Sequence, residues 1–157
     1  RVLRTCAVGE SNVDRAIGDL MTSSSPTVGL AAHAGQTDVR LAAKADTVEE
    51  ADAISAPMEA ELRKRLGVAL YGTGKETVEM ALLRHLAQAG LTLTVAESGT
   101  GGLLTNRLST APGAETLFVG GLVANDPPAL GQALEVTLEG ESEQDLEQFA
   151  RNNGIPV

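Results

Sequence analysis

The sequence predicts an α/β protein in which a small α+β domain is followed by a partial, three-layer-like α/β domain. Two observations carry this prediction. In the first part of the chain, alternating and helical hydrophobic patterns follow in the order strand, helix, strand, strand, helix. In the second part, helix and strand patterns alternate, which is typical of a layer with parallel strands. We therefore expect one domain over residues 1–70 and a second over residues 71–157.

The N-terminal segment carries the first strand and the first helix of this pattern. Residues 2–6 are expected to form a strand, with Cys6 buried as an inert thiol. A capping signal at residues 11–14 precedes the helix. The apolar residues of this helix follow the three-and-four spacing of an amphipathic helix: Val13, Ala16, Ile17, Leu20 and Met21.

Two strands and a longer helix complete the first domain. The strands are expected over residues 27–32 and 38–44. A capping box at residues 47–50 opens the helix, and Gly67 is expected to end it. Pro57 lies inside this helix and predicts a kink.

The second domain begins with a connector and a helix. Residues 68–72 are expected to be the connector, and a capping signal at residues 73–76 starts a helix that ends at Gly90. Apolar and polar residues then alternate up to the neighbourhood of Ser98, which is the pattern of a half-buried strand. A short helix is expected over residues 103–108.

The last part of the chain predicts a turn and a final helix. Asp126, Pro127 and Pro128 together indicate a turn. An acidic helix is expected over residues 143–153, with its apolar side chains on one side.

Ser98 lies where the predicted strand passes into the predicted short helix. Main-chain N–H groups at the start of a helix have no partner within the helix, so they are directed at groups near the serine. A nucleophile and an anion-binding cradle are therefore expected within a few residues of each other. The alternative is that Ser98 or Thr100 only caps the helix.

Three segments carry a family resemblance: residues 96–102 (AESGTGG), 108–115 (LSTAPGAE) and 118–124 (FVGGLVA). They resemble the C-terminal domain of the competence-/damage-inducible CinA family and the similar nicotinamide-mononucleotide amidohydrolases. The family pattern is A-E-S-C-T-G-G, a P-G-S-S-like turn, and a G-G-V-V-A-Y-S-N-E-A-K strand and loop. Upstream, residues 4–5, 9–11 and 38–45 resemble the small KH-like middle domain of the same family, but without the G-x-x-G loop of RNA-binding KH modules.

The resemblance implies deamidation of nicotinamide mononucleotide (NMN) to nicotinate mononucleotide and ammonia, without a cofactor. Ser98 would be the nucleophile, and a lysine of the N-E-A-K loop would be its base. Thr100, Gly101 and Gly102 would bind the substrate by donating to the developing oxyanion or to the phosphate. Three interpretations of Glu97 stay open: a helix-start anion, a residue that orients the site, or an exposed side chain. A structural role is favoured.

The chain departs from the family pattern at catalytic positions. Gly99 replaces the cysteine, Asn125 replaces the tyrosine of Y-S-N, and Leu130 replaces the base lysine in an ungapped alignment. No lysine follows Lys75, so the usual serine–lysine pair is impossible. Deamidation is therefore expected to be weak or absent. The alternative is a non-catalytic nucleotide-binding or assembly module of a CinA-like protein.

The composition argues against several function classes. The net charge is −9, and residues 76–157 carry 3 Lys/Arg against 11 Asp/Glu, so this half repels nucleic acid. One cysteine permits no internal disulfide, and no apolar run approaches the length of a membrane span. His33 and His85 are far apart in the sequence, so neither a metal site nor a histidine-based triad is expected.

The remaining expectations concern location and partners. A reducing cytoplasm fits the cysteine content. The chain begins at Arg1 without methionine and runs directly into a strand pattern, so a missing upstream domain is expected as a partner, beside NMN as the small-molecule partner. Domains of this size are near the lower limit of independent stability, which favours a homo-oligomer.

Overall fold

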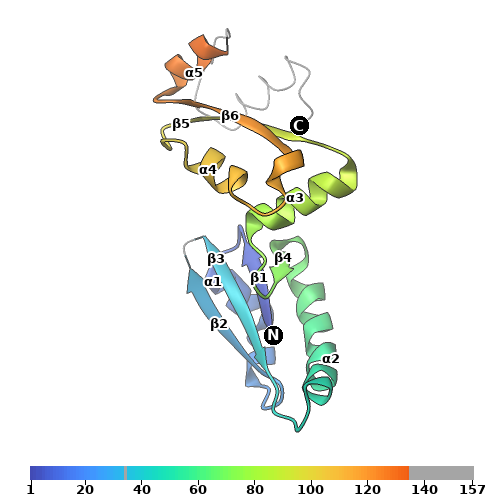
Figure 1. The fold of residues 1–157 in the computed structure, drawn as a ribbon. Helices are drawn as coiled ribbons and strands as arrows, with labels where there is room; N and C mark the ends of the chain where they lie inside the picture. The colour runs from blue at the N-terminus through green and yellow to red at the C-terminus, as the bar shows by residue number, and fades with distance from the viewer. Residues whose placement is uncertain (34, 135–157) are drawn as a thin grey trace. The chain divides into compact units, whose positions relative to one another are not determined.

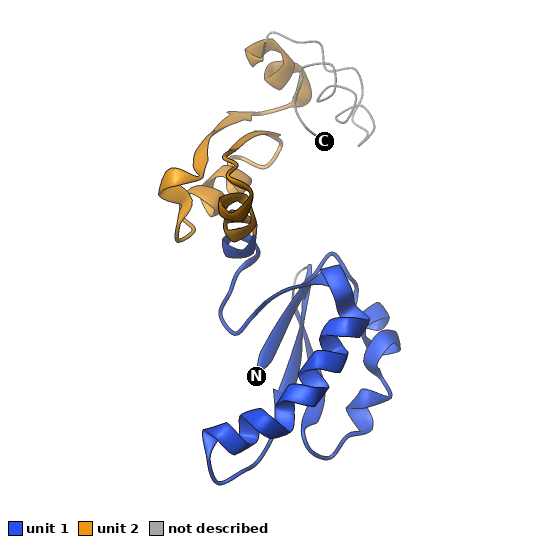
Figure 2. Cartoon of the chain, turned by 90° about the vertical axis from the view of Figure 1, so that its right-hand side faces the viewer, with its two compact units in different colours: residues 1–81 blue, residues 82–157 orange. Residues whose placement is uncertain are grey.

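The structure, a computed structural model, describes residues 1–33 and 35–134. The chain divides into two units, residues 1–81 and residues 82–157, which Figure 2 colours separately. Their content is mixed α/β as predicted, with a small α+β unit followed by an α/β unit. The acidic helix predicted over residues 143–153 lies outside the described residues.

Unit 1 begins with the predicted order of strand, helix, strand, strand and helix (Figure 1). The elements are β1 (Val2–Cys6), α1 (Glu10–Ile17), β2 (Thr27–His33), β3 (Gln36–Ala42) and α2 (Val48–Leu66), with 3₁₀ turns at Leu20–Thr22 and Gly67–Ala69. A fourth strand, β4 (Leu70–Thr73), corrects the prediction of a connector over residues 68–72. Its four residues are too few to show an alternating pattern, and its pairing with β1 supplies the hydrogen bonds.

The four strands form an antiparallel sheet in the order β2-β3-β1-β4. Side chains from three of the strands and from both helices form one core: Leu3, Val13, Ile17, Val28, Val39, Leu41, Leu62 and Leu66. Both helices therefore cover the face of the sheet that carries Leu3. Cys6 is half-buried and not fully buried as predicted, because alternation along β1 directs it to the other face.

The helix ends follow the sequence signals in part. Thr47 caps α2 as predicted, because its hydroxyl oxygen accepts a hydrogen bond from Glu50 N at 3.2 Å, and Gly67 ends the helix with a φ of +52°. The cap predicted at residues 11–14 is wrong. The α1 helix begins at Glu10, and the carbonyl of Gly9 accepts the first main-chain hydrogen bonds.

Unit 2 contains a parallel pair of strands connected by a helix. Its elements are β5 (Leu93–Ser98), α4 (Leu103–Ser109), a 3₁₀ turn at Ala114–Thr116, β6 (Phe118–Ala124) and α5 (Pro127–Ala133). The α3 helix (Val78–Ala89) begins in unit 1 and continues into unit 2. Thr77 caps α3, because its hydroxyl oxygen accepts a hydrogen bond from Met80 N at 3.3 Å. The predicted capping signal starts at Thr73, four residues before this cap.

A helix replaces the turn predicted at residues 126–128. Asp126 is the N-cap of α5, and its Oδ1 accepts a hydrogen bond from Ala129 N at 2.8 Å. Pro127 and Pro128 occupy the first positions of the helix, where a missing N–H costs no hydrogen bond within the helix. The proline pair therefore starts a helix here.

Candidate functional site

Ser98 is the last residue of β5, at the passage from this strand into the turn before α4, as the sequence predicts. The register pairs Ser98 with Ala124, the last residue of β6. The carboxyl ends of the two parallel strands therefore lie side by side, and the segments after them start at one edge of the sheet. Ligands of α/β sheets bind outside this edge. The Ser98 side chain is half-buried there.

Glycines shape the turn after Ser98. Gly99, Gly101 and Gly102 have φ angles of +73°, +64° and +88°. This left-handed region strains residues that carry a Cβ, and glycine enters it freely. Among the described residues, no atom lies within 4 Å of a Cβ built on Gly99, so there the cysteine of the family pattern would meet backbone strain without a clash.

Glu97 connects this turn to α4. It is 5% exposed, on the face of β5 opposite to Ser98. Its carboxylate accepts hydrogen bonds from the Thr100 hydroxyl, from Leu104 N at 3.0 Å and from Thr105 N at 2.8 Å. The N-cap residue of α4 is Gly102, so neither Ser98 nor Thr100 caps the helix with its own side chain. These contacts exclude the exposed interpretation of Glu97.

The hydrogen bonds to Glu97 set its charge. They lower its pKa from 4.5 to about 2, because the Thr100 hydroxyl and the main-chain N–H groups of Leu104 and Thr105 donate to the charged form. Glu97 is therefore a carboxylate at neutral pH, and the two N–H groups that face it are not available to a ligand. The N–H groups of residues 99–102 donate to no acceptor in the described part of the chain, and they remain the donors of the turn.

Gly121 allows α4 to approach the sheet closely. A Cβ built on Gly121 would lie 2.2 Å from Thr105 Oγ1 and 2.8 Å from Thr105 Cγ2. The Thr105 hydroxyl is buried and has no hydrogen-bond partner among residues 1–33 and 35–134. The missing side chain at Gly121 thus sets the distance between β6 and the first turn of α4.

Comparison with known proteins accounts for both halves of the chain. Residues 1–72 match the family described as the damage-inducible protein CinA KH domain, and residues 75–143 match the family described as the CinA C-terminal domain. The chain belongs to the CinA family. This agrees with the small α+β unit followed by an α/β unit.

Three CinA-like proteins show the extent of the similarity. The protein of Dictyoglomus thermophilum is 42% identical over 127 residues, which cover 80% of this chain and 31% of the relative. The protein of Parasynechococcus marenigrum is 39% identical over 139 residues (88% and 33%), and that of Frankia casuarinae is 41% identical over 140 residues (87% and 32%). The chain spans about a third of the length of these CinA relatives.

Several polar positions of the CinA pattern carry other side chains here. The P-G-S-S-like turn is residues 112–115, so its serines are replaced by Ala114, which is 4% exposed, and by Glu115, which is exposed. Leu130, which the ungapped alignment with the family pattern pairs with the lysine, belongs to α5 and is 7% exposed. Its side chain is apolar and packs against the protein.

The two histidines lie on different elements. His85 is exposed on α3, as predicted. His33, at the end of β2, places its Nε2 3.1 Å from Asp38 Oδ2, and the buried Asp38 also accepts from Arg4 at 3.3 Å. Among the described residues, no group of three His, Cys, Asp or Glu side chains could hold a metal ion. None of the described helices has the length and apolar composition needed to cross a membrane.

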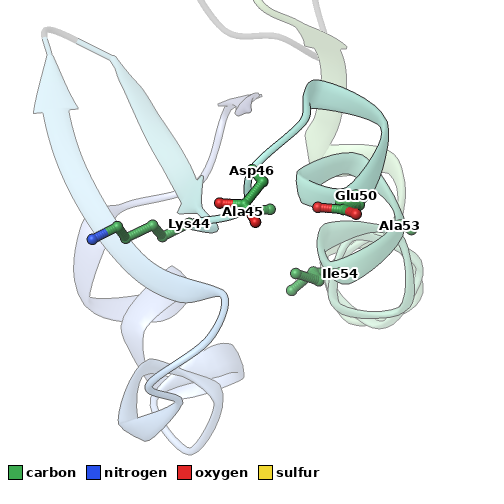
Figure 3. A pocket seen from close by; sticks show the side chains of 6 residues that line it. All are labelled: Lys44, Ala45, Asp46, Glu50, Ala53 and Ile54. Atoms are coloured by element: carbon green, nitrogen blue, oxygen red, sulfur yellow. The ribbon is translucent and has the colours of Figure 1, made fainter.

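A shallow hollow of about 640 Å³ lies in unit 1 beside the first turns of α2 (Figure 3). Its lining consists of Lys44, Ala45, Asp46, Glu50, Ala53 and Ile54. In Figure 3 the Lys44 side chain extends away from α2, while Glu50 and Ile54 belong to that helix. The hollow contains none of the predicted site residues, so it adds nothing to the chemistry of the Ser98 turn.

Proposed function

We propose that this chain is a CinA-family module in which deamidation of NMN is weak or absent. In the family reaction as we assign it, the serine oxygen attacks the carboxamide carbon. The nitrogen then leaves as ammonia after it gains a proton, and water releases nicotinate mononucleotide from the serine. A serine hydroxyl needs a base for this attack, because it is almost wholly protonated at neutral pH.

The observation that carries the proposal is the side chain at position 130. A positioned base contributes roughly 10²–10⁴-fold to such a reaction. Leu130 offers no proton acceptor, and no lysine follows Lys75 in the sequence to replace it. The loss of the P-G-S-S serines removes further hydroxyl groups from the same half of the chain.

A non-catalytic nucleotide-binding or assembly module is the second candidate. The glycine turn favours it, because the N–H groups of residues 99–102 have no acceptor in the part of the chain that the structure describes, and they suit an anionic group such as the phosphate of NMN. An upstream domain of the same protein and a second copy of the chain are the proposed protein partners. A cytoplasmic location belongs to the same proposal, since the single cysteine fits a reducing compartment.

Two assays on the full chain test these candidates. Ammonia release from NMN is expected to be weak or at the uncatalysed level, and Ser98→Ala is the comparison. Robust release that disappears in Ser98→Ala would overturn the first proposal.

Calorimetric titration with NMN tests the second candidate. We expect binding that weakens in Gly101→Ala, because a Cβ strains the turn at a φ of +64°. Gly90→Ala is the matched control, since Gly90 has a similar φ of +67° after α3 and also has no atom within 4 Å of an added Cβ. Absence of NMN binding, or equal weakening in both variants, would contradict nucleotide binding by the glycine turn.

A further inference from the structure

We infer that Glu97 is the positioning residue of the Ser98 turn: it fixes both the turn and the start of α4 to β5, and so holds the Ser98 hydroxyl at the ligand-binding edge of the sheet. The part of this inference that concerns a ligand rests on the proposed function. The anchoring itself does not.

The position of Glu97 next to Ser98 couples the two side chains. Successive residues of a strand point to opposite faces, so Glu97 faces α4 while Ser98 faces away from it. A rotation of the strand end that released Glu97 from α4 would also turn the Ser98 hydroxyl. Holding Glu97 therefore fixes the direction of Ser98.

The contacts of Glu97 bridge both ends of a flexible segment. The Thr100 hydroxyl lies within the turn, and the N–H groups of Leu104 and Thr105 lie in the first turn of α4. Glycine loses more conformational freedom on folding than any other residue, and three of the four residues between Ser98 and α4 are glycines. One side chain that binds the middle and the end of this segment selects a single conformation for it.

The anchoring requires the carboxylate form. All three groups that face Glu97 are donors, and a carboxylate only accepts. A glutamine amide would direct its own N–H groups toward one or more of these donors. The facing elements offer no other charge in its place, because β6 has no titratable residue and α4 has only Arg107, in its last turn.

Amide hydrogen exchange, measured by NMR on the full chain, tests the anchoring. In Glu97→Gln we expect exchange at Leu104 and Thr105 to rise at least about tenfold, which corresponds to the loss of one hydrogen bond to a charged group. The amide of Leu108, a buried residue of the same helix, reports whether the whole unit is destabilised. Glu115→Gln is the control, because Glu115 is an exposed glutamate of the same unit. Unchanged exchange at Leu104 and Thr105 in Glu97→Gln would overturn the inference.

A second variant keeps the test decisive if Glu97→Gln unfolds unit 2. Thr100→Val removes only the hydrogen bond within the turn and leaves the bonds to α4. We expect changed amide chemical shifts at residues 99–102, with Leu108 still protected. A turn that is unaffected by Thr100→Val would count against the anchoring.

NMN affinity adds a readout that a purely structural role would not change. Glu97→Gln is expected to weaken NMN binding about tenfold while the unfolding midpoint followed at Leu108 stays within error, and Glu115→Gln is expected to bind as the unchanged chain does. Equal NMN affinity in Glu97→Gln and the unchanged chain would overturn the role toward the ligand. If the unchanged chain binds no NMN, the nucleotide-binding candidate fails, and the exchange data still decide whether Glu97 anchors the turn.

Discussion

Glu97 is a charged residue on the buried face of the β5 strand. Alternation places it on the same face as Leu93 and Val95, the face that α4 covers. Burial of an unpaired carboxylate is costly, so the charge is retained only because donors surround it. The Thr100 hydroxyl and two main-chain N–H groups meet this need without a cation.

The lowered pKa of Glu97 predicts an acid-sensitive unit 2. Because its pKa is about 2 in the folded chain against 4.5 ordinarily, the stabilisation is fully present above pH 4.5 and is lost as the pH falls toward 2. In Glu97→Gln, the free energy of unfolding of unit 2 is expected to change less with pH across this range. The measurement is acid unfolding followed by amide signals of residues 93–124.

Signals of unit 2 are needed for this measurement because unit 1 has its own acid sensitivity. Arg65 lowers the pKa of both Asp19 and Glu61 in unit 1. Glu115→Gln serves as the control within unit 2. An acid transition of residues 93–124 that is the same in Glu97→Gln and in Glu115→Gln would contradict the prediction.

Gly121→Ala is expected to destabilise unit 2 by about 1–3 kcal/mol, the usual cost of overpacking. The added Cβ would lie 2.2 Å from Thr105 Oγ1, so α4 must shift away from β6. Urea unfolding followed at Leu108 measures the change. Gly29→Ala is the control, because no atom lies within 4 Å of a Cβ at this strand position.

A double variant identifies the cause of the Gly121→Ala effect. Thr105→Ala removes the two atoms nearest to the new Cβ while keeping the main-chain N–H that donates to Glu97. The pair Gly121→Ala and Thr105→Ala should therefore recover most of the lost stability. A double variant as unstable as the sum of the two single variants would show that the contact is not responsible.

At the scale of elements, the sequence predicts long periodic segments well and short ones poorly. The α2 helix begins at its predicted capping box, because a cap depends on residues three positions apart. The β4 strand escapes prediction, because its four residues acquire their structure by pairing with β1, about 70 residues earlier in the sequence. The residues of β4 alone do not indicate that β1 pairs with them.

The Asp126 cap of α5 gives a prediction at this scale. Asp126→Ala is expected to lower the free energy of unfolding by about 0.5–2 kcal/mol, because Ala129 N loses its acceptor. The first turn of α5 then opens to solvent more often. Exchange of the Ala129 amide measures the loss. Asp126→Asn keeps an acceptor oxygen and should behave like the unchanged chain; equal exchange in the Ala and Asn variants would contradict the capping role.

The candidate site was predictable in its position and less so in its contacts. The alternation before Ser98 and the glycines after it mark a strand that passes into a helix. The bonds from Glu97 to Leu104 and Thr105 span seven and eight residues and depend on how α4 folds back on β5. The same alternation does place Glu97 on a buried face, and a buried carboxylate implies donors nearby.

At the scale of the whole molecule, unit 2 exposes large apolar side chains. Val119, Leu103 and Leu91 are 72%, 59% and 56% exposed. A two-stranded sheet is marginally stable by itself, and burial of such side chains against another molecule would stabilise it. We therefore predict self-association of the chain.

Light scattering at increasing protein concentration checks this prediction. The expected result is a mass above that of one chain, which Val119→Lys lowers toward the monomer. Exposed Val48 of unit 1, replaced by lysine in the same way, is the control for added charge. A monomeric mass at all concentrations, with a single unfolding transition, would count against self-association.

Self-association bears on catalysis, because a neighbouring chain is the remaining lysine source for a base, through Lys44, Lys64 or Lys75. Ammonia release from NMN per chain, measured across protein concentration, therefore tests most directly whether the Ser98 turn lacks a base. The proposed absence of a base predicts weak or uncatalysed release at every concentration. Robust release that rises with concentration and disappears in Ser98→Ala would contradict it, and its loss in Lys44→Met, Lys64→Met or Lys75→Met would identify the base.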